Sequence, residues 1–211
     1  MPELPTFKFL AAGAIFGLTA GISPGPLLAL VITESLKHNR LAGIKIAISP
    51  LITDLPIIII TLFVFNLVSD SDKILGLISI TGSTYLLYLA YKTMKINGYD
   101  MELQNSGRGS LVKGMVANLL NPHPYLFWAT IGSPYINKAL EINLYTVILF
   151  LLSFYGLLLG SKIIIAIISD KSKTFINQSS FTWILRVLGI ALFIFAVLFF
   201  YDGLRSVISG E

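Results

Sequence analysis

Long apolar stretches separated by short polar segments run through the whole chain. An α-helix needs roughly 20 apolar residues to cross the hydrocarbon core of a membrane, and these stretches reach that length. The pattern predicts spanning helices at 7–33, 42–68, 74–94, 111–136, 142–168 and 183–207. The predicted fold class is therefore an all-α integral membrane protein with six transmembrane helices.

Two of these stretches contain a proline-rich motif where a spanning helix should be continuous. Residues 21–26 read Gly-Ile-Ser-Pro-Gly-Pro, and residues 118–124 read Asn-Leu-Leu-Asn-Pro-His-Pro. Proline has no N–H group, so the carbonyl groups of Ala20 and Ile22 lose their helical donors in the first motif. Unsatisfied carbonyl groups are costly in lipid, so such a break is tolerated only where it is buried in protein or lines a wet cavity.

Each motif is also predicted to start a new half-helix. Ser23-Pro24 and Asn121-Pro122 both place a polar N-cap before a proline at the first helical position. Paired breaks of this kind indicate the binding site of a transporter, although simple packing kinks are the alternative. The predicted substrate-binding residues are Ser23, Pro24, Gly25, Pro26, Asn118, Asn121, Pro122 and His123.

The spans divide into two groups of three, and the first span of each group carries the break. We predict a three-helix repeat at 1–97, a cytoplasmic connecting loop at 98–110 and a second, inverted three-helix repeat at 111–211. Because the two halves run in opposite directions, the positive ends of both new half-helices face the membrane midplane. An anionic group fits between them.

Composition and charge agree with this picture. Hydrophobic residues make up 55% and charged residues 12% of the chain, whereas soluble domains average about 25% charged residues. Lys and Arg gather after the first, third and fifth predicted spans, which places those loops in the cytoplasm and both termini outside. A span missed near the N-terminus would instead place that terminus inside.

Among the residues of the predicted spans, Asp54 most strongly indicates a functional role. It lies near the middle of the second stretch, where a charged Asp costs roughly 2.5–3.5 kcal/mol to insert. Intramembrane carboxyl groups commonly bind ions, relay protons or contact substrate. We interpret Asp54 as the proton-coupling residue; a neutral Asp hydrogen-bonded to a neighbouring helix is the alternative.

Three other ionisable residues lie in or near the spans. Lys162 is in the fifth stretch, and we expect its long side chain to extend to the cytoplasmic interface; an ion pair with Asp54 is the second interpretation. Glu34 follows the first break and is either a solvated end charge or a gate contact. His123 lies inside the second break. The chain's other histidine, His38, is in a loop, so the two histidines are not expected to form a metal site.

The motifs described above resemble those of the lysine exporter (LysE/RhtB) family. The resemblance covers essentially the whole chain: its length, the spans, the Pro-Gly-Pro break with Gly17 upstream, Gly43, Asp54 and the Asn121-Pro122 pair. It implies a proton-coupled exporter of amino acids or related small metabolites in the cell membrane. Family members often have Lys after the Asn-Pro pair, where this chain has His123.

Several other functions are excluded or left open by the residues. The chain has no cysteine, which excludes a thiol-redox carrier, and it lacks the His-Glu motif of an intramembrane zinc hydrolase. We therefore predict a protein that is not an enzyme and needs no cofactor. Its expected partners are a small-molecule substrate and the lipid bilayer, not nucleic acid. Export of another small solute or cation, a scaffolding role and a homo-oligomer remain open.

Overall fold

The computed structural model describes residues 3–63, 71–95, 109–175 and 178–209. All regular structure in these ranges is helical. The elements are α1 (Glu3–Ile22), α2 (Pro26–Lys37), α3 (Arg40–Ala47), α4 (Ser49–Phe63), α5 (Ser71–Met94), α6 (Ser110–Leu119), α7 (Pro122–Phe127), the π-helical turn η2 (Trp128–Gly132), α8 (Ser133–Leu140), α9 (Leu144–Ser172), the short 3₁₀ turn η3 (Lys173–Phe175) and α10 (Gln178–Ser209).

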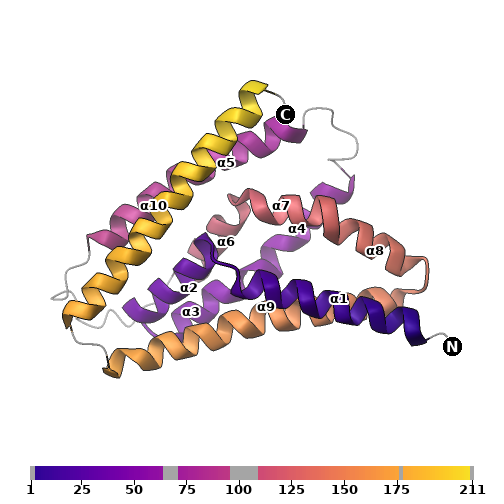
Figure 1. The fold of residues 1–211 in the computed structure, drawn as a ribbon, viewed down its shortest axis with the longest axis horizontal. Helices are drawn as coiled ribbons and strands as arrows, with labels where there is room; N and C mark the ends of the chain where they lie inside the picture. Colours follow the sequence, from indigo (N-terminus) through magenta and orange to yellow (C-terminus); the bar gives the residue numbers. More distant parts are fainter. Residues whose placement is uncertain (1–2, 64–70, 96–108, 176–177, 210–211) are drawn as a thin grey trace.

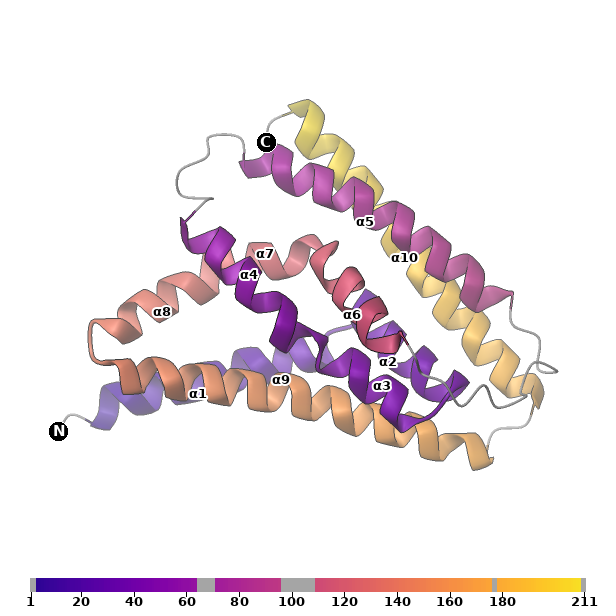
Figure 2. The same cartoon turned by 180° about the vertical axis from the view of Figure 1, so that it is seen from behind.

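The long helices form two pairs, α1 with α9 and α5 with α10 (Figure 1). The shorter helices α2, α3, α6 and α7 lie between these pairs in both views (Figures 1 and 2). Both proline-rich breaks, which separate α1 from α2 and α6 from α7, therefore lie between the two long pairs, although Ser23 and Pro24 of the first break are exposed.

Glycine permits the close packing of α1 on α9. Gly13 and Gly17 of α1 lie so close to α9 that an added Cβ would meet the backbone carbonyl groups of Phe150 and Phe154. Helices in membranes associate largely through van der Waals packing, which small residues allow by letting backbones approach. The pair α5 and α10 uses the same device, because a Cβ on Gly76 would lie 2.9 Å from the carbonyl oxygen of Gly203.

Several helices have the length and apolar character needed to span a membrane. Within the described residues, three stretches meet this requirement: Arg40–Ile59, Leu144–Phe175 and Thr182–Ile208. A fourth span results if Thr6–Ile22 and Pro26–Lys37, which are bent by 60° at the first break, are counted together. The predicted total of six spans and their inverted arrangement stay predictions.

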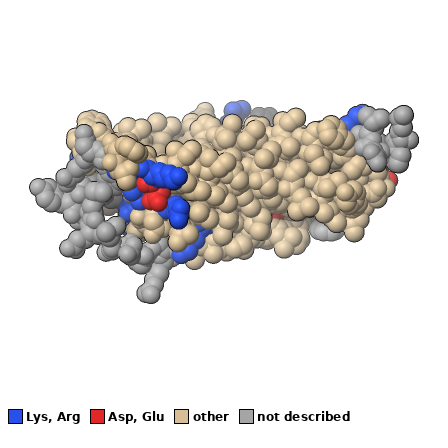
Figure 3. Space-filling model, turned by 90° about the horizontal axis from the view of Figure 1, so that it is seen from below, with Lys and Arg blue, Asp and Glu red and all other residues tan. Residues whose placement is uncertain are grey.

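The outer surface fits a membrane environment. Large apolar side chains of α9 such as Leu152, Ile164 and Ile168 are exposed. Figure 3 shows Lys and Arg side chains gathered mainly toward one end of the visible face, with a long, nearly uncharged middle section. An apolar band with charges beyond it is the distribution that a lipid bilayer favours.

The structure corrects the predicted start of the first new half-helix. The helix begins at Pro26 and its N-cap is Gly25, with no side-chain cap, so Ser23-Pro24 is not the cap and first residue. The residue before a proline is driven to extended angles, and Gly25 indeed has φ −176° and ψ 176°. A helix therefore cannot continue from Pro24 through Gly25.

Other predicted boundaries differ by a few residues. The second stretch is divided at Ile48, between α3 and α4, and its predicted end at 64–68 lies outside the described residues. The fifth and sixth predicted spans, 142–168 and 183–207, correspond to α9 and α10. Each helix continues past the predicted last residue, α9 to Ser172 and α10 to Ser209. Most of the predicted connecting loop, 98–108, also lies outside the described residues.

Candidate functional site

A cavity of about 480 Å³ lies where the two breaks meet. Both half-helix starts line it, together with residues from α4, α9 and α10. Of the predicted substrate-binding residues, Pro122 is not in the cavity wall. The others all line it: Ser23, Pro24, Gly25, Pro26, Asn118, Asn121 and His123.

The second break has the cap that the sequence predicts. The side chain of Asn121 accepts a hydrogen bond from the backbone N–H of His123 at 3.1 Å, and Pro122 is the first residue of α7. The buried Tyr125 then donates its hydroxyl hydrogen to the carbonyl oxygen of Leu119 at 3.0 Å. This bond satisfies a carbonyl group that the break leaves without a helical donor.

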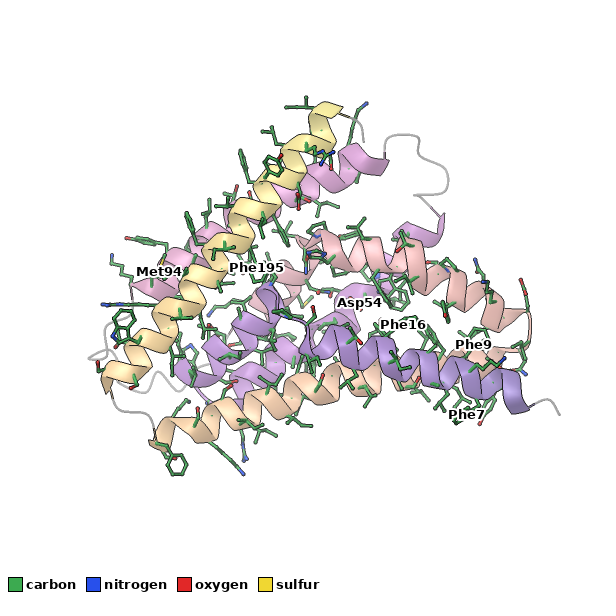
Figure 4. The ribbon with its side chains drawn as sticks, in the orientation of Figure 1. Phe7, Phe9, Phe16, Asp54, Met94 and Phe195 are labelled. Atoms are coloured by element: carbon green, nitrogen blue, oxygen red, sulfur yellow. The ribbon has the colours of Figure 1, made fainter. Side chains whose placement is uncertain are left out.

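Asp54 of α4 is buried, with 4% of its surface exposed, and it lines the cavity. Its Oδ1 accepts a hydrogen bond from Asn118 Nδ2 at 2.9 Å, and its Oδ2 accepts one from the Tyr155 hydroxyl at 3.2 Å. The side chain of Trp128 forms a further hydrogen bond with this carboxyl group. In Figure 4, Asp54 lies between Phe16 of α1 and Phe195 of α10.

The partners of Asp54 show what the sequence interpretation missed. Asn118 also donates to Thr53 Oγ1 at 2.8 Å, so one amide group holds two neighbouring residues of α4. From the sequence, Trp128 either lines the cavity or faces lipid, and the structure places it in the cavity wall; no sequence pattern singles out Tyr155. A buried indole N–H or phenol O–H usually finds a polar partner, which is the signal that could have connected these aromatic residues with an intramembrane Asp.

Lys162 does not extend to the cytoplasmic interface, so that prediction is wrong. Its side chain lines the cavity and only 3% of the residue is exposed. The ammonium group donates to the carbonyl oxygens of Ala20 at 3.1 Å and Gly21 at 2.8 Å. The structure also gives it no ion pair with Asp54. Lys162 instead satisfies the last turn of α1, including the Ala20 carbonyl group that loses its donor to Pro24.

Glu34 is not a solvated end charge. It is buried in α2, where its Oε2 accepts a hydrogen bond from Ser110 Oγ at 2.7 Å. Its Oε1 pairs with Lys113 Nζ at 2.8 Å, and His38 Nε2 lies 3.8 Å from Oε2. Ser110 and Lys113 belong to α6, so this cluster connects α2 of the first break to α6 of the second.

Aromatic rings form much of the remaining cavity wall. The rings of Phe127 and Phe154 stack with their centroids 5.2 Å apart, and Trp128 contacts Phe154 edge-on at 5.4 Å. His123 lies against Phe199 of α10, with 5.6 Å between ring centroids. Among the described residues, no group of three or more His, Cys, Asp or Glu side chains could hold a metal ion.

The comparison with protein families connects this geometry to a known class of protein. The family model for LysE type translocators matches residues 18–203. The chain belongs to the LysE type translocator family. The match includes both breaks and both charged residues of the cavity. Searches of curated proteins and of solved structures gave no match.

Membership of the LysE type translocator family makes this chain a multi-pass membrane protein that transports small solutes. Its cavity combines charged and apolar groups. It contains one carboxyl group and one ammonium group, two interrupted helices and an apolar wall. The cavity thus presents charged side chains of both signs to a small polar molecule.

Proposed function

We propose that this translocator exports amino acids or related small metabolites across the cell membrane, driven by the proton gradient. The observation that carries the proposal is the cavity at the two helix breaks, which contains the buried Asp54. Both half-helix starts line this cavity, and helix N-termini bind carboxylate groups. An amino acid offers a carboxylate group to these helix ends and an ammonium group to Asp54.

The packing of the helices supports alternating access by two inverted repeats. α1 of the first predicted half packs on α9 of the second, and α6 of the second half packs on α3 and α4 of the first. The third helices of the halves, α5 and α10, pack on each other. Each broken helix thus packs on the second span of the opposite half, as an inverted pair requires. Rocking of one half against the other would open the cavity to each side in turn.

Asp54 is the proposed proton carrier. Export against a gradient needs an energy source, and the chain lacks the Gly-rich motif of a nucleotide-binding P-loop. A carboxyl group can bind a proton while its site is closed to water and release it when the site opens. The hydrogen bonds from Asn118 and Tyr155 hold this carboxyl group in place at the cavity wall.

The test is transport in liposomes with an imposed pH gradient, using a panel of labelled amino acids. We expect the wild-type protein to accumulate at least one of them. Asp54→Asn keeps the size and shape of the side chain but cannot carry the proton, so it should lose pH-driven accumulation of substrate. Asp170→Asn, which changes a carboxyl group that pairs with Lys173 outside the cavity, is the matched control.

Two outcomes would contradict parts of this proposal. If Asp54→Asn still drives substrate uphill at the wild-type rate, Asp54 is not the proton carrier, and His123 in the same cavity becomes the next candidate. If the wild-type protein moves none of the amino acids in either direction, the proposed substrate class is wrong.

A further inference from the structure

The ammonium group of Lys162 has no counter-charge in the described part of the protein. It is buried in the middle of α9, and both of its hydrogen-bond acceptors are neutral carbonyl groups, those of Ala20 and Gly21. A buried charge without an ionic partner is costly. An ammonium group has three N–H donors, and two of them are used here. Because Lys162 lines the cavity, its remaining donor is available to a ligand.

A second source of positive charge lies in the same cavity. Gly25, Pro26, Leu27 and Leu28, which form the start of α2, all line it. No side chain caps this helix, and its first backbone hydrogen bond runs from the N–H of Ala29 to the carbonyl oxygen of Gly25 at 3.0 Å. The N–H groups of Leu27 and Leu28 therefore stay available for an anion at the positive end of the helix dipole.

The rest of the cavity limits which anion fits. Asp54 supplies the side-chain carboxyl group of the cavity lining, and hydrogen-bond donors from three other elements hold that group in place. Apart from Asp54, Lys162 and the residues of the two breaks, apolar and aromatic side chains such as Phe127, Phe154 and Phe195 dominate the lining. One fixed positive and one fixed negative charge match a zwitterion. A second positive charge on the substrate would find no second carboxylate group in this lining.

We propose that Lys162, together with the first N–H groups of α2, binds the carboxylate group of a zwitterionic amino acid whose side chain is uncharged. This inference rests on the proposed export of amino acids and names the residue that recognises their common group. Asp54 then faces the substrate ammonium group across the cavity. Loading the site adds no net charge, so the occupied cavity can close to water without burying an unpaired ion.

The experiment compares L-leucine with L-leucinamide, in which a neutral amide replaces the carboxylate group, as substrates in proteoliposomes. The wild-type protein should prefer leucine. Lys162→Gln should lower the leucine rate on the order of tenfold to hundredfold, the range for one hydrogen bond to a charged group. The leucinamide rate should stay the same, which also shows that the variant folds. Lys171→Gln, an exposed position on the same helix, is the matched control and should leave both rates unchanged.

The absence of cysteine permits a more direct test of charge. Lys162→Cys introduces the chain's one thiol, which 2-aminoethyl methanethiosulfonate converts to a side chain ending in an ammonium group. Methyl methanethiosulfonate adds a neutral group instead. The cationic reagent should restore the preference for leucine, and the neutral reagent should not.

Different results separate the failure of this inference from the failure of the proposed function. If Lys162→Gln lowers the leucine and leucinamide rates equally, Lys162 only caps the carbonyl groups of α1 and the inference is wrong. If the neutral reagent restores the preference for leucine as well as the cationic one, the preference needs no charge at this position, and the inference is also wrong. If the wild-type protein transports neither leucine nor any other amino acid, the proposed function fails, and the inference fails with it.

Discussion

The Glu34–Lys113 pair leads to an asymmetric prediction about stability. The two charges are 2.8 Å apart, but their surroundings differ: 4% of the Glu34 side chain is exposed and 27% of the Lys113 side chain. If Lys113 is removed, a carboxylate group stays buried without its main counter-charge. If Glu34 is made neutral, the Lys113 ammonium group can still reach water. We therefore expect Lys113→Met to be the more damaging substitution.

The sizes of the two effects follow from this difference in exposure. Breaking a buried ion pair so that one charge is left uncompensated costs about 3–5 kcal/mol. The lower end applies to Lys113→Met, because the bond from Ser110 and the nearby His38 still support Glu34. Glu34→Gln loses one charge-assisted bond to a partly exposed lysine, about 1–2 kcal/mol. The expected difference in the free energy of unfolding is about 2 kcal/mol.

The assay is thermal unfolding of the purified protein in detergent, followed by tryptophan fluorescence. For a chain of this length, 1 kcal/mol corresponds to about 2–4 °C, so Lys113→Met should unfold about 4–8 °C below Glu34→Gln. Adding Glu34→Gln to Lys113→Met should recover part of the loss, since it removes the stranded charge. The reasoning is refuted if Lys113→Met is no more damaging than Glu34→Gln, or if the double variant is the least stable of the three.

Three further predictions concern helix packing, the first break and the topology. Gly17→Leu should prevent α1 from packing on α9 and lower the thermal midpoint more than the same change at Gly25, where an added Cβ meets nothing within 4 Å. Replacing both Pro24 and Pro26 with Ala should abolish transport without preventing membrane insertion, because the restored N–H groups let α1 and α2 join; full transport would show that the prolines are only kinks. A cysteine at position Ser106 should react with an impermeant reagent only in inverted vesicles, and labelling of intact cells would reverse the predicted orientation.

Local rules account for the features that the sequence determined by itself. A long apolar stretch must be helical in lipid because its backbone polar groups have no other partners, and α9 and α10 were predicted on that basis. The missing N–H groups of closely spaced prolines favour the breaks at Pro24 and Pro122, whereas the single Pro56 lies inside α4. The start of α2 at Pro26 also follows from a local rule, because a residue before a proline, here Gly25, avoids helical backbone angles.

The partners of the charged residues were decided only by the tertiary structure. Tyr155 meets Asp54 across 101 positions of sequence, and Lys162 meets Ala20 across 142. Which helices meet depends on how closely their surfaces fit, as Gly13 and Gly17 allow between α1 and α9. The sequence thus predicted that a freed carbonyl group at Ala20 must be satisfied, but not that a lysine would satisfy it. The physical reason is that backbone geometry constrains neighbours along the chain, whereas a hydrogen-bond donor from another helix is selected by packing.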